Sequence, residues 1–298
     1  MKRRQFLKVC VGALVGGFVL PRRASPQEPA IMRLNDRLSV VARARTNVVA
    51  LSTGDGAVVV DSGAPQYRDA LMESLRQLSP GARINKVFNT HYHPDNTGAN
   101  ELLRQSGATI VAHENTRLWL TTDVLYPWNG KRFTRLPKAA QPNKTFYTTG
   151  QLTSDIRYGY IPDAAHTDGD MYVHFPKQNV LAVGDAVCAD GWPTVDYATG
   201  GWIGGIVGAL QRLQAMADAD TRIVPARGPV IGLTELKAQL QMYATIYGRL
   251  TQLLNKGRSP VEAVAANPTK EFDAQMGNPD EFVRRAFESL WGYLSPDA

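Results

Sequence analysis

Three potential metal ligands lie two residues apart in the segment 89–98, Asn-Thr-His-Tyr-His-Pro-Asp-Asn-Thr-Gly. They are His91, His93 and Asp95, and they follow an apolar run. Two imidazoles and a carboxylate this close together can converge on one cation, and zinc binds neutral imidazole nitrogen and carboxylate oxygen readily. The alternative interpretation is a polar turn with two solvated histidines, because short motifs of this kind also occur by chance.

Further polar residues stand at the ends of other predicted strands. His166 lies in the turn Ala165-His166-Thr167-Asp168-Gly169-Asp170, and Asp185 follows Gly184 directly after an apolar strand. Arg227 comes two residues after a last short strand. These positions indicate that the strand ends together build one polar site.

Periodicity and turn residues indicate elements along the whole chain after residue 30. We predict strands at 37–44, 46–52, 57–61, 84–89, 109–112, 156–161, 171–175, 180–183 and 223–225, and helices at 67–78, 97–106, 204–216 and from 233 onward. Strands followed by helices, repeated in two halves, predict sheets packed between helices. Residues 121–150 are rich in proline and basic residues and are predicted to be a long loop or a short hairpin region. Such a loop is either a lid or binding loop or a plain surface insertion.

The first 25 residues form a segment of different character. They carry six basic residues and no acidic one, and Lys2-Arg3-Arg4-Gln5-Phe6-Leu7-Lys8 resembles a twin-arginine export signal. The apolar stretch 9–20 is shorter than the roughly 20 residues that span a bilayer, and it is typical of a secretory signal. A basic, frayed N-terminus is the alternative, and retention as an uncleaved anchor stays open. We expect residues 1–25 to be a signal read by the twin-arginine machinery, residues 31–298 to be the folded domain, and the protein to be periplasmic or otherwise exported.

Charge and cysteine content restrict the possible functions of the body, by which we mean the chain after the 25-residue leader. The chain has 33 basic and 27 acidic residues, and without the six basic residues of the leader the numbers are 27 and 27. A near-neutral body does not indicate a nucleic-acid-binding surface, and we expect a small-molecule substrate instead. Cys188 is the sole cysteine after the leader, so we expect a buried, inert thiol and no disulfide within the body.

Five segments in this order resemble the metallo-β-lactamase superfamily over about residues 48–230. They are Val60-Asp61-Ser62-Gly63, His91-x-His93-x-Asp95, the turn with His166, Val183-Gly184-Asp185, and Pro225-Ala226-Arg227-Gly228-Pro229. The resemblance implies an α/β fold, the four-layer αββα sandwich, with metal at one edge between the two sheets.

The resemblance also implies roles for individual residues. His91, His93 and His166 match the three histidines that bind one zinc in the family, and Asp185 matches an aspartate that commonly bridges two metals. Three imidazoles plus one open position are expected of a catalytic zinc, which lowers the pKa of its water toward about 7.

The second metal site of the family is incomplete in this chain. Asp95 is retained, but Asn96 and Arg227 stand where the family has histidines. Asparagine is a poor zinc ligand, and a guanidinium stays protonated with no lone pair to donate. Arg227 could bind either carboxylate, Asp95 or Asp185, and supply the missing positive charge; the alternative is an outward-facing arginine. We predict one zinc, at the three-histidine site.

The leading functional hypothesis is an exported, zinc-dependent hydrolase, mononuclear, that acts on an ester, thioester, lactone or lactam. Asp95 and Asp185 are the candidate catalytic carboxylates, with Asp95 as general base. Asp61 is expected to orient the His91 loop by hydrogen bonds. Candidate substrate-binding residues are the loop aromatics Trp128, Trp192 and Tyr197. A catalytically weak or inactive metal- or ligand-binding protein and a dedicated β-lactamase are the alternatives, because fold likeness does not choose a substrate.

Overall fold

The computed structural model describes residues 30–42, 45–81 and 83–294. The predicted export signal, residues 1–25, lies outside the described residues.

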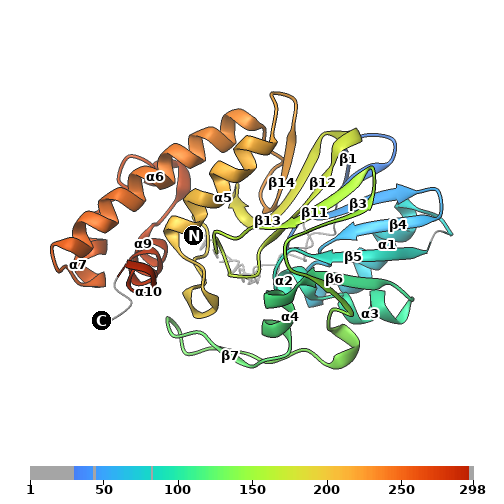
Figure 1. The fold of residues 1–298 in the computed structure, drawn as a ribbon, viewed down its shortest axis with the longest axis horizontal. Helices are drawn as coiled ribbons and strands as arrows, with labels where there is room; N and C mark the ends of the chain where they lie inside the picture. The colour runs from blue at the N-terminus through green and yellow to red at the C-terminus, as the bar shows by residue number, and fades with distance from the viewer. Residues whose placement is uncertain (1–29, 43–44, 82, 295–298) are drawn as a thin grey trace, which may run out of the picture.

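Two sheets face each other at the centre of the molecule (Figure 1). The first has seven strands in the order β1 (Ala30–Arg33), β2 (Leu38–Ala42), β3 (Val48–Thr53), β4 (Gly56–Val60), β5 (Ile84–Asn89), β6 (Thr109–His113) and β9 (Lys144–Phe146). The second has five strands in the order β10 (Thr149–Thr153), β11 (Ile156–Tyr160), β12 (Met171–Phe175), β13 (Val180–Cys188) and β14 (Arg222–Arg227). Each sheet contains both antiparallel and parallel pairs. The pairs β4–β5 and β5–β6 of the first sheet and β13–β14 of the second are parallel, so the carboxyl ends of the strands in each pair lie at the same edge.

Helices cover the outer face of each sheet, so the layers run αββα (Figure 1). The first group is α1 (Arg68–Leu78), α2 (Pro94–Thr97), α3 (Asn100–Gln105) and α4 (Glu114–Leu120). The second group is α5 (Ile203–Met216), α6 (Leu233–Asn255), α7 (Pro260–Ala265), α8 (Asp273–Met276), α9 (Asp280–Glu288) and α10 (Trp291–Leu294). The predicted four-layer sandwich is confirmed.

The alternation of side chains explains why both faces of the first sheet are apolar. In β4, Val58 and Val60 point into the core between the sheets, whereas Ala57 and Val59 pack against α1 and α3. On α5, the residues Ile203, Ile206, Leu210 and Leu213 recur with helical spacing and are buried against the second sheet.

The segment 121–150 differs in part from its prediction. A short hairpin does form, from β7 (Val124–Leu125) and β8 (Arg132–Phe133). However, β9 pairs with β6 at the edge of the first sheet, and β10 begins the second sheet. The prediction of a loop was wrong there. Both strands are short and contain polar residues, so no apolar run marks them in the sequence, and they are stabilised by pairing with β6 and β11.

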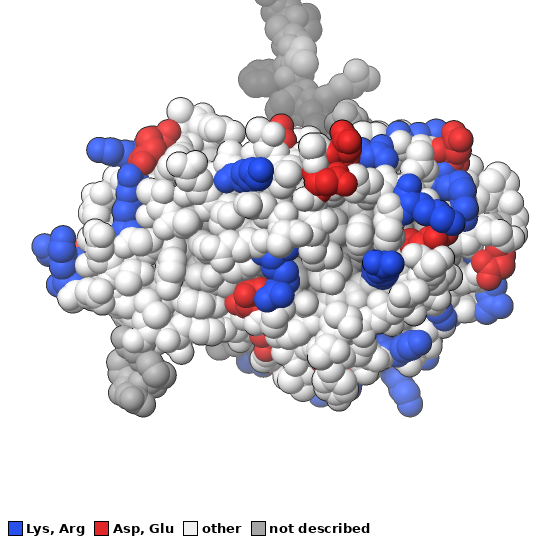
Figure 2. All heavy atoms as spheres, turned by 45° about the horizontal axis from the view of Figure 1, so that its top comes forward, with Lys and Arg blue, Asp and Glu red and all other residues white. Residues whose placement is uncertain are grey.

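Basic and acidic side chains are interspersed on the face shown in Figure 2, with wide areas that carry neither. This distribution agrees with the balanced charge of the body. In the described part of the chain, no helix combines the length and the apolar character needed to cross a bilayer.

Candidate metal centre

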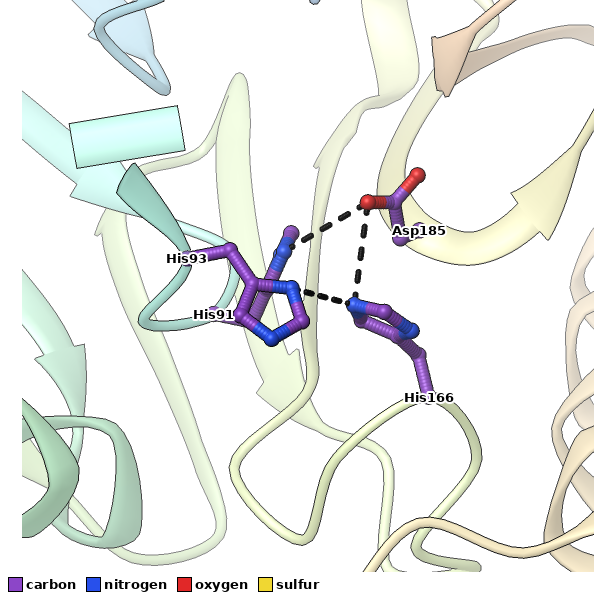
Figure 3. Close-up of side chains that lie close together, drawn as sticks. All are labelled: His91, His93, His166 and Asp185. Carbon is purple, nitrogen blue, oxygen red and sulfur yellow. Dashed lines mark hydrogen bonds and ion pairs between the residues drawn. The ribbon is translucent and has the colours of Figure 1, made fainter. Parts of the chain in front are cut away.

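Four side chains converge at one edge of the sandwich: His91, His93, His166 and Asp185 (Figure 3). One potential ligand atom from each lies within 4.8 Å of the others. Asp185 Oδ2 lies 3.5 Å from His91 Nε2 and 3.7 Å from His166 Nε2, and His93 Nδ1 lies 2.8 Å from His166 Nε2. The structure therefore brings together the four residues that the sequence predicted as metal ligands.

The ends of neighbouring strands position these ligands. His91 and His93 follow β5, and His166 lies in the turn before β12. The amide of Met171, the first residue of β12, donates to the carbonyl of Thr90, which ties the two loops together. Asp185 lies in β13 after an irregularity in the pairing with β14, where Gly184 adopts a φ of 58°. Such a bulge redirects the next side chain, here toward the histidines.

Hydrogen bonds on the outer side of two imidazoles determine their tautomers. His166 Nδ1 lies 2.7 Å from the carbonyl oxygen of Thr194, which can only accept, so this nitrogen carries the proton. His93 Nε2 lies 2.9 Å from Asp196 Oδ2 and donates to that carboxylate in the same way. In the neutral rings, the lone pairs of His166 Nε2 and His93 Nδ1 therefore face each other.

The third imidazole is oriented by a longer chain of hydrogen bonds. Thr90 Oγ1 donates to Asp61 Oδ2 over 2.8 Å, and it lies 3.1 Å from His91 Nδ1. Because the hydroxyl proton is directed to Asp61, His91 Nδ1 donates to Thr90 Oγ1. The lone pair of His91 Nε2 then points toward Asp185, and this buried atom has no hydrogen-bond partner among the described residues.

This donor set fits a divalent cation. The two nitrogens 2.8 Å apart can share either a proton or a metal cation, and the carboxylate of Asp185 lies beside them. Burial, together with the neighbouring His166 and His93, holds the pKa of His91 well below its usual range, so its ring stays neutral as a ligand requires. Three imidazoles with fixed outer partners are the arrangement that zinc sites use, and the rings bind the metal in their neutral form.

Asp61 lies behind the His91 loop, which it was expected to orient by hydrogen bonds. Its carboxylate accepts hydrogen bonds from the amide and hydroxyl of Thr90 and from Asn96 Nδ2. Burial raises the pKa of Asp61 to about 7, although these hydrogen bonds oppose the shift. Its φ of 63° lies in the left-handed region, which aspartate tolerates better than most residues.

The residues at the place of a second metal make other contacts. Arg227 Nε lies 3.2 Å from Asp185 Oδ1, so of the two carboxylates it binds Asp185. Asn96 turns its amide nitrogen to Asp61, 2.8 Å away. Asp95 does not join the histidine cluster; its Oδ2 lies 3.9 Å from Arg45 Nε, at the surface.

Sequence reasoning missed the role of Asp196 and Tyr92. The Tyr92 hydroxyl donates to Asp196 Oδ2 over 2.5 Å, next to the bond from His93. Burial alone would raise the pKa of Asp196, but the bonds from His93 and Tyr92 hold it below its usual value. No local signal marks this partner, because 103 positions separate His93 from Asp196.

Two of the predicted substrate-binding aromatics lie near the histidines. Trp128 stacks on Tyr126 with ring centroids 5.0 Å apart, and Tyr126 lies 6.3 Å from the ring of His93. Tyr197 contacts the edge of Trp128. The guanidinium carbon of Arg285, which the sequence analysis did not single out, lies 4.2 Å from the centre of the Trp128 ring.

Trp192 lies in a different setting. Its ring stacks on Phe282 of α9 with centroids 4.7 Å apart, and its Nε1 donates to the carbonyl of Gly277. The same tryptophan lines a cavity that also reaches Arg227.

The sequence profile of the metallo-beta-lactamase superfamily matches residues 42–231. The chain belongs to this superfamily. Among curated proteins, it is similar to hydroxyacylglutathione hydrolases from Erythrobacter litoralis (27% identical over 121 residues, 40% of this chain and 41% of the relative) and Gloeothece citriformis (25% over 169 residues, 56% and 57%). The chain thus matches 41% and 57% of the length of these relatives.

Solved structures of the metallo-beta-lactamase fold agree with the architecture. A metallo-beta-lactamase from Pontibacter korlensis superposes with a TM-score of 0.57 at 21% identity, covering 72% of this chain and 99% of its own. A stereoselective inverting sec-alkylsulfatase from Pseudomonas sp. gives a TM-score of 0.64 at 16% identity, covering 89% of this chain and 50% of its own. At these identities the likeness shows the fold alone.

Proposed function

We propose that this metallo-beta-lactamase superfamily member is a mononuclear zinc-dependent hydrolase. The observation that carries the proposal is the set of outer hydrogen bonds that leaves three imidazole lone pairs and Asp185 converging on one point. A zinc ion held there would supply Lewis-acid chemistry and make water a nucleophile near neutral pH.

The chain's own carboxylates take different parts in the proposal. Asp185 offers one oxygen to the histidine cluster and is held at the other by Arg227, so it is a ligand with a fixed orientation. Asp95 has a side-chain exposure of 27% and lies outside the cluster. It is not assigned as a metal ligand and is our candidate proton acceptor. Trp128, Tyr197 and Trp192 would form the wall for the substrate.

We propose an ester, thioester, lactone or lactam as substrate, and among these classes we favour a thioester. The support is the likeness to hydroxyacylglutathione hydrolases, which are thioester hydrolases. A β-lactam is the narrower alternative, because the similar metallo-beta-lactamase structure is related at the level of fold.

A metal- or ligand-binding protein without turnover is the second candidate. The observation that favours it is the ion pair of Arg227 with Asp185, since the family's second metal is thereby replaced by a fixed cation.

Metal content and turnover, measured on the same preparations, test the proposal. We expect one zinc per chain and hydrolysis of at least one member of a panel of chromogenic esters, thioesters, lactones and lactams. His166→Ala should lose both zinc and turnover, whereas His174→Ala, which changes a histidine of β12 outside the cluster, should keep both. Bound zinc with no turnover of any panel member would favour the binding protein instead.

We further propose that the protein is exported by the twin-arginine machinery, on the basis of the pattern Lys2-Arg3-Arg4. Changing Arg3 and Arg4 together to lysine should move the protein from the periplasmic to the cytoplasmic fraction of a bacterial host. An unchanged distribution would contradict export by this route.

A further inference from the structure

The β7–β8 hairpin forms a two-stranded sheet of its own, apart from the two central sheets (Figure 1). It contributes to a small apolar cluster whose buried members are Tyr92, Leu120, Val124 and Phe133. Tyr92 is fully buried, and its ring centroid lies 5.2 Å from that of Phe133 in β8. Because Tyr92 stands between the candidate ligands His91 and His93, the hairpin packs directly on the segment that carries them.

The hydroxyl of Tyr92 has two hydrogen-bonding neighbours. It donates to Asp196 Oδ2 over 2.5 Å, and it lies 3.2 Å from the hydroxyl of Tyr126, which follows β7 in the hairpin. Asp196 Oδ2 also accepts from His93 Nε2. A continuous series of hydrogen-bonded groups therefore runs from the hairpin to a candidate metal ligand, in the order Tyr126, Tyr92, Asp196, His93.

The carboxylate of Asp196 is oriented through one of its oxygens. Its Oδ1 is buried and has no hydrogen-bond partner among the described residues, so the bonds from Tyr92 and His93 to Oδ2 set its direction. The outer partner of a ligand imidazole determines how that ring is oriented, and the partner is itself held by further hydrogen bonds. A displaced Tyr92 hydroxyl would therefore change the orientation of the His93 ring.

Tyr126 is fixed within the hairpin. Its amide donates to the carbonyl of Lys131, and its carbonyl accepts from the amide of Gly130. The Trp128 ring stacks on Tyr126 with centroids 5.0 Å apart, and the guanidinium carbon of Arg285 in α9 lies 4.2 Å from the centre of the Trp128 ring. Tyr126 is thus held by its own turn and by a C-terminal helix, so its hydroxyl is a fixed partner for Tyr92.

We propose that Tyr126 is a positioning residue of the metal centre and acts on His93 through Tyr92 and Asp196. The hairpin then orients His93 for zinc, and zinc, by fixing His93, orders the hairpin. The two effects are reciprocal, because they share one coupling free energy. The inference rests on the zinc site of the proposed function and does not require turnover.

Variants that lack one hydroxyl test this route. Tyr126→Phe keeps the ring, so zinc affinity, measured by competition with a chelator, should fall about two- to tenfold, as expected for the loss of one hydrogen bond. Tyr92→Phe should lower zinc affinity further, because it also removes the bond to Asp196. The matched control is Tyr147→Phe, which removes the hydroxyl of a tyrosine that is 70% exposed and should leave zinc affinity unchanged.

A double variant separates this route from a general loss of packing. In the Tyr92→Phe chain, the Tyr126 hydroxyl has lost the group through which it acts, so adding Tyr126→Phe should not lower zinc affinity any further. An equal loss from Tyr126→Phe in both backgrounds would overturn the inference, and so would an unchanged affinity in the single variant. Circular dichroism checks that each variant is folded.

Hydrogen exchange measures the same coupling at the hairpin. The amides of Tyr126 and Gly130 donate within the turn, so zinc should slow their exchange in the unaltered chain by about twofold or more, and by less in Tyr126→Phe. Equal exchange with and without zinc in the unaltered chain would overturn the inference.

These measurements also separate this inference from the proposed function. Zinc binding with the coupling but without turnover would count against the hydrolase and leave the role of Tyr126 standing. Zinc binding and turnover without the coupling would refute the role of Tyr126 alone. A chain that binds no zinc would refute both.

Discussion

Arg227 Nε lies 3.2 Å from Asp185 Oδ1, while the other oxygen of the same carboxylate lies 3.5 Å from His91 Nε2. One carboxylate is therefore shared between a fixed guanidinium and the candidate metal ligands. The guanidinium supplies positive charge on the side where the superfamily's second metal would lie, and it would repel a second cation there.

The first prediction concerns this replacement. Changing Asn96 and Arg227 together to histidine should raise the zinc content from one to two per chain, because two imidazole lone pairs replace an amide and a cation. Asn96→His alone should keep one zinc, since Arg227 still binds Asp185. Metal analysis of the purified chains gives the answer, and a single zinc in the double variant would contradict our account of the second site.

The second prediction concerns Asp196 as a positioning residue. Asp196→Asn removes the carboxylate that accepts from His93 Nε2, so zinc affinity should fall by about 10–100-fold. Competition with a chelator measures the affinity, and circular dichroism checks that the fold is kept. Asp155→Asn, which removes a partly exposed carboxylate paired with Lys177, is the control and should have no effect. Equal affinities in the two variants would exclude this role.

The third prediction concerns Gly184, which precedes the shared aspartate. A Cβ there would lie 2.4 Å from Thr90 Oγ1, and the φ of 58° disfavours any other residue. Gly184→Ala should therefore cost about 1–2 kcal/mol for the backbone and a further 1–3 kcal/mol for the contact. It should also weaken zinc binding, because Thr90 orients His91.

Gly130 offers a matched control for that change. Its φ is 68°, but a Cβ there would meet nothing within 4 Å. Gly130→Ala should show the backbone cost alone and leave zinc affinity intact. Denaturant unfolding of both variants measures the difference, and losses of equal size would refute the steric argument.

The fourth prediction concerns Cys188, which is 2% exposed and so buried as the sequence analysis expected. Burial raises the pKa of its thiol to about 12, so at pH 8 only about one thiol in 10⁴ is ionised, against about one in four for a free thiol with a pKa near 8.5. In a Cys10→Ser chain, which retains Cys188 alone, iodoacetamide should modify the folded protein at least about 100-fold more slowly than the unfolded protein.

The pH dependence of this reaction follows from the direction of the shift. A raised thiol pKa means that the folded chain keeps a proton that the unfolded chain releases above about pH 8.5. Modification of the folded protein should therefore keep accelerating between pH 8 and pH 11, and the thiol's contribution to stability should decline over the same range. Mass spectrometry follows the reaction, and a rate that levels off near pH 9 would contradict the shifted pKa.

The sequence by itself determined the class of fold and the candidate metal ligands. Alternating apolar residues in β4 and helical spacing in α5 are local patterns, and each directs its element to a particular face of a sheet. The histidines of the cluster can also be predicted from the sequence. His91 and His93 lie two residues apart in a turn, and the remaining segments occur in the order of the superfamily.

The tertiary structure decided the contacts that surround those ligands. The partner of His93 is Asp196, 103 positions away, and the arginine over Trp128 comes from a helix near the C-terminal end. Which carboxylate Arg227 binds, and the pairing of β9 with β6, likewise depend on how separate segments pack. Local periodicity determines which face of an element is buried, but the direction of a single polar side chain follows from the packing of the whole domain.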